Sequence, residues 1–240
     1  MKLNNKETAC SYEAAKAQDK HSIRVITLEQ NILEENDIIA EENRNNFKKH
    51  NVFVVNLISS PGSGKTTLLV KTVEYLKEEF RCAVIEGDQQ TSNDAKRIAE
   101  TGVPVVQINT NSSCHINAAQ IREAMASLPV EDLDLLIIEN VGNLVCPAEF
   151  DLGENKKIAI MSVCEGEDKP IKYPLLFSLS DLLVLTKIDL LPYLRFDMEM
   201  CKQYAQNINP NISIFETSSY TEKGLENWIN CLRKMVRDGT

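Results

Sequence analysis

The chain has 240 residues, of which 43% are hydrophobic, and it carries a formal net charge of −9 with a sequence pI near 5.0. This length and apolar content suffice for one large domain with a sizeable core. The acidic balance argues against a nucleic-acid or anionic-membrane surface, because no basic cluster is present to neutralise phosphates.

The amino-terminal segment, residues 1–22, is polar and has no periodic apolar pattern, so we expect a flexible tail there. It lacks the apolar core of a secretory signal, and no apolar run approaches the roughly 20 residues that span a bilayer. The seven cysteines are odd in number and include no CxxC pair, which argues against a disulfide framework. These features favour a cytoplasmic protein with reduced thiols.

Residues 23–50 mix apolar positions with Glu, Asn and Lys in a spacing that predicts an amphipathic helix. The apolar positions are Leu28, Ile32, Leu33, Ile38, Ile39 and Phe47. We expect this helix to pack on the domain that follows, residues 51–240, through those side chains.

Beyond residue 51, short β-branched runs alternate with segments of helical spacing. The runs are VFVVNLI, CAVIE, VPVVQI, LDLLIIE, KIAIMSV, DLLVLTK and NISIFE. This alternation predicts an α/β fold, with a mostly parallel, doubly wound sheet of about seven strands and helices on both faces. Ligands of such sheets bind at the carboxyl ends of the strands, so functional residues are expected where each strand ends.

The first predicted strand ends in SSPGSGKTT, residues 59–67, which fits the phosphate-loop pattern GxxxxGK[ST] with Ser59 in place of the first glycine. Glycines in this loop let successive backbone amides face an anion, and the helix that begins near Lys65 adds its positive end. Lys65 is expected to reach the β- and γ-phosphates, and Thr66 to give its hydroxyl to Mg²⁺. The candidate nucleotide-binding residues here are Gly62, Ser63, Gly64, Lys65, Thr66 and Thr67.

Base identity is indicated by TKID, residues 186–189, at the end of the sixth predicted strand. The Asp189 carboxylate can accept two hydrogen bonds from the N1 and N2 donors of guanine, a pair that adenine does not offer. Lys187 is expected to lie along the base, and the loop that contains Ser218, residues 216–224, to give backbone amides to the guanine carbonyl. A solvated turn is the alternative for TKID alone, but after a phosphate loop it favours GTP.

Two further strand ends carry carboxylates. Asp88 follows CAVIE in EGDQQTSNDAKR, and Glu139 is placed at the end of LDLLIIE, before VGN. Both are expected to bind Mg²⁺ directly or through water, and with Lys65 they are the catalytic candidates. The Gly142 amide is expected to contact the γ-phosphate. A helix cap at Asp88 and a solvated strand end at Glu139 are the alternatives, and which carboxylate aligns the attacking water stays open.

Two thiols lie close to these strand ends in the sequence. In NTNSSCHINAAQIREAM, Ser112 or Ser113 is expected to cap a helix whose first turn holds Cys114 and His115, a position that lowers a thiol's pKa. Cys146 comes four residues after Gly142, on a predicted loop. Each residue alone could be incidental, but their joint placement beside the predicted nucleotide site favours a shared role.

Six motifs together resemble the HypB family of hydrogenase maturation GTPases, phosphate-loop proteins of the SIMIBI class, over about residues 24–237. They are NLISSPGSGKTTLL, IEGDQQTSNDAKRI, CHINAAQI, ENVGNLVCPAEFDLGE, EGEDKPIKYP and TKIDLLPY. The resemblance implies a GTP-hydrolysing nickel chaperone that dimerises with nucleotide and helps insert Ni²⁺ into the large subunit of [NiFe]-hydrogenase. It also implies a small zinc-containing partner, HypA, and a Ni²⁺ or Zn²⁺ site of Cys114, His115 and Cys146 at the dimer interface.

The chain departs from many relatives at its amino terminus, where Cys10 and His21 stand in place of a cysteine motif or a histidine-rich tract, so no storage role is expected. The cysteines at 82, 164, 201 and 231 do not match the family's ligands and are expected to be structural. GTP and Mg²⁺ are expected to order residues 139–146, and hydrolysis to loosen them.

Three other functions remain open at this point. A urease-type nickel accessory GTPase is disfavoured by the CH pair at 114 and 115, and a small-molecule kinase is disfavoured by Asp189. A metal-binding dimer switched by nucleotide with little catalysis would show GTP-dependent dimerisation without hydrolysis.

Overall fold

The computed structural model describes residues 31–88, 92–110 and 113–239, and the fold is described for these residues. The expectations for residues 1–22, including Cys10 and His21, lie outside this range, as does the first part of the expected amino-terminal helix. Within it, residues 31–50 are helical.

The described strands form one seven-stranded sheet in the order β3-β2-β4-β1-β5-β6-β7, and every neighbouring pair is parallel. The strands are β1 (Phe53–Ser59), β2 (Cys82–Asp88), β3 (Val105–Asn109), β4 (Leu135–Gly142), β5 (Lys156–Ser162), β6 (Leu182–Thr186) and β7 (Ser213–Glu216). Each coincides with one of the predicted β-branched runs, because strands covered on both faces need apolar side chains at successive positions. The predicted parallel, doubly wound sheet is therefore confirmed.

Helices connect the strands and cover the sheet. After the helix of residues 31–50 they are α2 (Lys65–Leu76), α3 (Asn93–Ala99), α4 (Ala118–Met125), α5 (Cys146–Glu149), α6 (Lys169–Lys172), α7 (Pro174–Leu179), α8 (Met198–Ile208) and α9 (Leu225–Asp238), with 3-10 turns η1 (Val130–Asp132) and η2 (Ile188–Tyr193). Among the described residues, no helix has the length and apolar character needed to cross a membrane.

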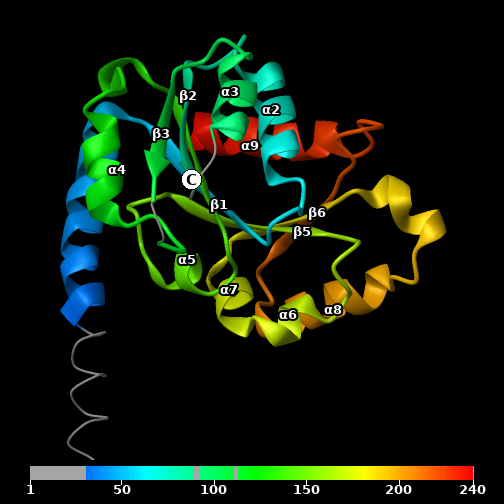
Figure 1. Ribbon diagram of the computed structural model, residues 1–240. Helices are drawn as coiled ribbons and strands as arrows, with labels where there is room; N and C mark the ends of the chain where they lie inside the picture. Colours follow the sequence, from blue (N-terminus) through cyan, green and yellow to red (C-terminus); the bar gives the residue numbers. More distant parts are fainter. Residues whose placement is uncertain (1–30, 89–91, 111–112, 240) are drawn as a thin grey trace, which may run out of the picture.

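The core is divided by the sheet into two layers. Alternate residues of β1 point to opposite faces, so Val55 packs with α2, α3 and α9, whereas Val54 packs with α4 and the helix of residues 31–50. Ile58 faces a third cluster formed with α5, α7 and α8. Figure 1 shows the blue amino-terminal helix beside α4, and α5 to α8 along the lower edge.

The amino-terminal helix packs through a face that hydropathy does not predict. Its buried residues are Asn36, Ala40, Asn43 and Phe47. Two of the expected packing residues are exposed instead, Ile32 at 50% and Ile38 at 64%. The expectation was wrong for these two because the asparagine amides satisfy backbone groups of the domain. Asn43 Nδ2 donates to the Ala118 carbonyl at 2.9 Å and the Leu152 carbonyl at 3.2 Å.

Strand β4 contains a bulge that the sequence does not reveal. In its pairing with β1, Leu57 lies opposite Glu139 but Ser59 lies opposite Gly142, so one extra residue of β4 is accommodated between them. A bulge re-aims the chain that leaves it, and here it falls at Asn140 and Val141. Glu139 was expected at the end of this strand, but it lies inside β4, where it is 2% exposed, so a solvated strand end is excluded.

Candidate nucleotide and metal site

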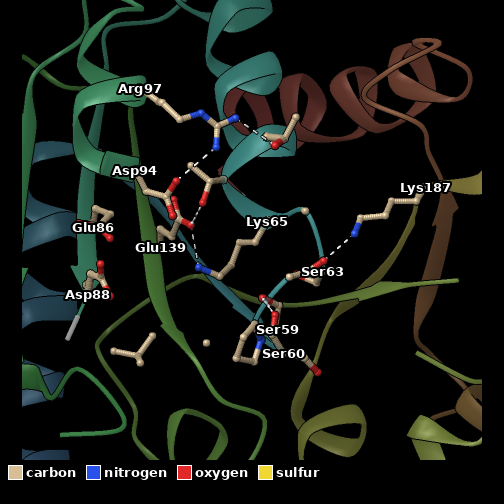
Figure 2. A pocket seen from close by; sticks show the side chains of 18 residues that line it. Ser59, Ser60, Ser63, Lys65, Glu86, Asp88, Asp94, Arg97, Glu139 and Lys187 are labelled. Carbon is tan, nitrogen blue, oxygen red and sulfur yellow. Dashed lines mark hydrogen bonds and ion pairs between the residues drawn. The ribbon is translucent and has the colours of Figure 1, made fainter. Parts of the chain in front are cut away.

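A pocket of about 590 Å³ opens at the carboxyl ends of the central strands, as predicted for this kind of sheet. The phosphate loop, residues 59–67, forms one wall. The labelled side chains in Figure 2 include carboxylates from β2, β4 and α3 and the cations Lys65, Arg97 and Lys187. The pocket is therefore built from charged groups of both signs around a glycine-rich loop.

The phosphate loop has the curled backbone that its glycines predict. Gly62 and Gly64 have positive φ angles of 74° and 90°, which favour glycine, and α2 begins directly after Gly64, at Lys65. The loop is tied to β6, because Thr186 Oγ1 donates to the Ser63 carbonyl at 2.5 Å and Lys187 Nζ donates to the Gly62 carbonyl at 2.6 Å. The start of α2 thus borders the pocket, the position that an anion-binding helix end requires.

Two of the predicted catalytic and Mg²⁺-binding residues, Lys65 and Thr66, contact a third, Glu139. Its Oε1 accepts hydrogen bonds from Lys65 Nζ at 2.7 Å and from Thr66 Oγ1 at 2.6 Å. The Glu139 Oε2 atom is buried and has no hydrogen-bond partner among the described residues. Asp88 ends β2 and lines the same pocket. The carboxylate of Glu139 thus keeps one oxygen without a partner among the described residues.

Glu86 is a pocket residue that the sequence analysis missed. It lies opposite Glu139 in the β2–β4 register and is 3% exposed, and its Oε2 also has no partner among the described residues. Burial, together with the nearby charges of Glu139 and Asp88, raises the pKa of Glu86 to about 8. Strand alternation was the available signal, because a residue two positions before Asp88 points to the same face.

Arg97 is a second missed residue of this pocket. Its guanidinium donates to Thr67 Oγ1 at 3.1 Å and forms an ion pair with Asp94 at 3.2 Å. Its distance in sequence from the phosphate loop left no local pattern to indicate this contact. Arg97 places positive charge over the first turn of α2.

The predicted base-recognition residues come together beside the phosphate loop. Ser218 Oγ donates to Asp189 Oδ1 at 2.5 Å, which orients the carboxylate. Lys187 adopts a left-handed φ of 60°, and its side chain passes close to Gly64, where an added Cβ would lie 3.5 Å from the lysine Cε. The Ser218 amide is not free, because it donates to the Lys223 carbonyl at 2.9 Å. Lys187, Asp189 and Ser218 thus form one corner next to the pocket.

Cys114, His115 and Cys146 form a cluster of metal-ligand type. Their ligand atoms all lie within 4.8 Å of one another, and all three residues are half-buried. The two Sγ atoms are 2.9 Å apart, and Cys114 Sγ is 3.7 Å from His115 Nδ1. Burial lowers the pKa of His115, and the hydrogen bond between Cys146 and Cys114, followed by burial, raises the pKa of Cys146. A neutral imidazole of this kind is ready to ligate a metal ion.

The local structure around the thiols differs from the expectation. Helix α4 begins at Ala118 and is capped by Asn117, whose side chain and Gln120 form a reciprocal capping box. Cys114 and His115 therefore precede the helix, and the cap is Asn117 and not Ser113, while Ser112 lies outside the described residues. The expected placement of Cys114 in the first turn of a helix is therefore wrong. Cys146, expected on a loop, is the first residue of α5.

The cluster has one aromatic neighbour that the sequence analysis missed. The His115 ring stacks on Phe150, with centroids 3.9 Å apart and an interplanar angle of 29°. Phe150 follows α5 directly, so this contact joins the two segments that carry the thiols. No periodic pattern links the two positions.

The other cysteines are not alike. Cys82 and Cys201 are buried, and burial raises the pKa of each thiol to about 12, as expected for structural residues. Cys231 is half-buried. Cys164 is exposed, so the expectation of a structural role in the core is wrong for this residue. None of these four belongs to the candidate metal cluster found among the described residues.

Comparison with known proteins identifies the family. Residues 53–216 match the family described as CobW/HypB/UreG, nucleotide-binding domain. The chain is 52% identical over 209 residues to the hydrogenase maturation factor HypB of Escherichia coli K12, covering 87% of this chain and 72% of the relative. It is 40% identical over 223 residues to the hydrogenase/urease maturation factor HypB of Helicobacter pylori J99, covering 91% of this chain and 90% of the relative.

A solved structure supports the same assignment. The crystal structure of HypB from Helicobacter pylori in complex with nickel superposes with a TM-score of 0.81 at 40% identity, covering 85% of this chain and 96% of that chain. The similarity therefore extends over the sheet, the phosphate loop and the thiol segments together. The chain belongs to the CobW/HypB/UreG family, within it to the HypB hydrogenase maturation factors, and it is a GTPase of that family.

Proposed function

We propose that this protein couples GTP hydrolysis to the delivery of Ni²⁺ into the large subunit of [NiFe]-hydrogenase. The observation that carries the proposal is that a phosphate loop, the Asp189 corner and the cluster of Cys114, His115 and Cys146 lie at one end of one sheet. A nucleotide site alone would fit many enzymes, and a thiol cluster alone would fit many metal-binding proteins. Their combination fits a nucleotide-driven metal chaperone.

The phosphate pocket supplies the groups for phosphoryl transfer to water. Lys65, now paired with Glu139, is placed to exchange that partner for the β- and γ-phosphates of GTP. Oxygen donors of Thr66, Asp88 and Glu139 suit Mg²⁺, a hard cation, and the unpartnered Glu139 Oε2 supports this fit. When bound, Mg²⁺ would neutralise charge on the phosphates. Asp88 and Glu139 are the candidates for orienting the attacking water.

Guanine selectivity is assigned to Asp189. Its carboxylate, held by Ser218, can accept hydrogen bonds from two guanine donors, and the Lys187 stem can cover the base. A small-molecule kinase would be expected to use ATP, so this corner disfavours that function. Gly142 is the candidate for contact with the γ-phosphate because its backbone packs on the phosphate loop, where an added Cβ would lie 3.1 Å from Pro61.

Nickel or zinc is the cargo that the thiol cluster fits. Two sulfur ligands and one imidazole suit both ions, and three ligands leave the coordination incomplete, as transfer requires. A second copy of the chain could complete it, so we place the metal at the interface of a GTP-dependent homodimer. A HypA-like zinc protein and the hydrogenase large-subunit precursor are the proposed partners. Selectivity for nickel must come from them, because thiolates also bind zinc well.

The central test measures hydrolysis of GTP and of ATP, with and without Ni²⁺, together with the molecular mass in solution. The proposal expects GTP to be hydrolysed in preference to ATP and the mass to double with a GTP analogue. GTP-dependent dimerisation without hydrolysis would favour a nucleotide-switched metal-binding dimer, and ATP use would contradict the proposal.

A matched pair of cysteine variants tests the metal site. Cys146→Ala should weaken Ni²⁺ and Zn²⁺ binding while leaving guanine nucleotide binding intact, because Cys146 lies in the cluster and outside the phosphate pocket. Cys164→Ala is the control, since this exposed thiol lies outside the cluster. Equal metal binding by both variants would remove Cys146 from the site, and loss of nucleotide binding in Cys146→Ala would indicate a packing role.

A second candidate function is maturation of urease. It is favoured by one observation, that the Helicobacter pylori relative is named a hydrogenase/urease maturation factor. Complementation of strains that lack either maturation pathway separates the two functions. Rescue of hydrogenase activity alone would support the first proposal, and rescue of both would support a dual role.

A further inference from the structure

Strand β4 carries the phosphate pocket on one face and the thiol segments on the other. Leu135 and Ile137 belong to the core cluster beside α2, whereas Leu136 and Ile138 belong to the cluster beside α4. Continuing this alternation, Glu139 points to Lys65 and the adjacent Asn140 points to the opposite face. One strand end therefore touches both sites through neighbouring residues.

The Asn140 side chain holds the bulge of β4 against the Cys-His segment. Its Oδ1 accepts from the Val141 amide at 3.0 Å, a group at the bulge, and from the Ile116 amide at 3.2 Å. Ile116 directly follows His115. The Asn140 Nδ2 donates to Asn56 Oδ1 at 3.3 Å, and Asn140 is fully buried at 0% exposure. A displacement of β4 at Glu139 must therefore move the backbone next to His115 or break buried hydrogen bonds.

Asn143 makes a second bridge immediately after the strand. Its Nδ2 donates to the Cys114 carbonyl at 3.3 Å, and its Oδ1 accepts from the Val145 amide at 3.0 Å. Val145 directly precedes Cys146. A single half-buried amide thus joins the backbones that carry the two sulfur ligands.

The same segments are packed against the nucleotide pocket. Gly142 lies so close to Pro61 of the phosphate loop that an added Cβ would come within 3.1 Å of it. On the neighbouring strand, an added Cβ at Gly87 would lie 2.5 Å from the Ile116 side chain. Gly87 separates Glu86 from Asp88. Close packing of this kind transmits small shifts of the backbone.

We propose that Asn140 and Asn143 are positioning residues that make the spacing of Cys114 and Cys146 depend on what occupies the phosphate pocket. The inference rests on the proposed function, since it needs both a guanine nucleotide and a metal ion to bind. When the γ-phosphate of GTP contacts Gly142, which packs against Pro61 of the phosphate loop, the end of β4 adjusts, and the two amides carry that change to the thiol segments. By linkage, metal binding must change nucleotide affinity by the same factor.

The test is a comparison of Zn²⁺ affinity in the full chain with GDP and with a non-hydrolysable GTP analogue, read by competition with a chromophoric chelator. In the unmodified protein we expect Zn²⁺ to bind at least about fivefold more tightly with the GTP analogue. In Asn143→Ala this ratio should fall to about one, because the link between Cys114 and Val145 is lost, while the affinity for each nucleotide stays within about twofold.

The chain offers a close control in Asn209. Its Nδ2 donates to the Phe177 and Ser180 carbonyls, and its Oδ1 accepts from the Asn211 amide at 3.0 Å, two residues ahead, as Asn143 does with Val145. Asn209 lies between α8 and β7, on the side of the sheet's amino-terminal strand ends. Asn209→Ala should therefore lower the melting temperature in a similar way and leave the Zn²⁺ ratio unchanged.

A second variant separates the two bonds of Asn143. Asn143→Asp keeps an acceptor for the Val145 amide and loses the donor to Cys114, so we expect it to lose the ratio as well. An unchanged ratio in both Asn143 variants would overturn the inference, and so would equal loss in Asn143→Ala and Asn209→Ala. A ratio of one in the unmodified protein would also overturn the inference. The proposed function would still stand in that case if the protein hydrolyses GTP and binds Zn²⁺ in separate measurements.

Discussion

Replacing Glu139 by glutamine changes how the phosphate pocket holds Lys65 before nucleotide binds. The pair is buried, with side chains 10% and 2% exposed and a separation of 2.7 Å. A buried charge that loses its partner costs about 3–5 kcal/mol. Because a glutamine oxygen can still accept from Thr66, we expect the lower end of this range. The free energy of unfolding without nucleotide should therefore fall by about 3 kcal/mol.

This cost applies only while the pocket is free of phosphate. GDP brings a new anionic partner to Lys65, so the GDP-bound Glu139→Gln protein is not destabilised as the nucleotide-free variant is. By the thermodynamic cycle, the free energy of GDP binding becomes more favourable by the same amount, and about 3 kcal/mol corresponds to roughly 100-fold in affinity. In EDTA, where Mg²⁺ cannot bind Glu139, GDP should therefore bind the variant more tightly than the unmodified protein.

Urea unfolding and GDP titration, both in EDTA, measure the two quantities. The control is Asp132→Asn, since Asp132 is 78% exposed and lies 3.8 Å from Arg81, so its loss should change neither quantity. An unchanged free energy of unfolding in Glu139→Gln, or weaker GDP binding in EDTA, would refute the account of Lys65 as a buried cation that depends on Glu139.

Three other substitutions address Asp189, the buried carboxylate of Glu86 and the loop of residues 216–224. Asp189→Asn should weaken GTP binding by about 100-fold and bring the ratio of GTP to ATP affinity near one, since it loses a charged acceptor; equal GTP affinity in titrations would exclude Asp189 from base recognition. In EDTA and without nucleotide, the free energy of unfolding of Glu86→Gln should exceed that of the unmodified protein increasingly as the pH rises from 5 to 8. The Glu86 pKa, raised from 4.5 to about 8, gives stability that is present below pH 4.5 and lost toward pH 8, and a constant difference would contradict this. Gly224→Ala should lower the melting temperature far more than Gly102→Ala, because both have positive φ but an added Cβ meets the Glu216 carbonyl oxygen at 1.9 Å in the first and nothing within 4 Å in the second.

Local patterns account for the parts of the fold and site that the sequence predicts. The phosphate loop is contiguous, and its two positive-φ glycines and the helix at Lys65 follow from that short stretch. Each strand is a β-branched run, and the parallel order brings distant strand ends together, so that Asp88 and Glu139 line one pocket. The meeting of Cys114 and Cys146 follows from the same topology once both segments are placed at strand ends.

Features that depend on side-chain hydrogen bonds were not predictable. The bulge in β4 is stabilised by Asn140 and the start of α4 by Asn117, and neither choice follows from hydropathy. The prediction that Ile32 and Ile38 pack on the domain was wrong, because the helix docks through Asn36 and Asn43, which bind backbone groups far away in the chain. Such partners are visible only in the folded chain.

The asparagine contacts of the amino-terminal helix also imply an order of events during protein synthesis. Asn36 bonds to a residue 115 positions later, and Asn43 to residues 75 and 109 positions later. At about 5–20 residues per second, the ribosome needs roughly 6–23 seconds to make the 115-residue stretch from Asn36 to Asp151. During this time the helix has been made but its docking surface has not. Because two of its four buried residues, Asn36 and Asn43, are amides, the inward face exposes less apolar surface during this time than an all-apolar stripe would.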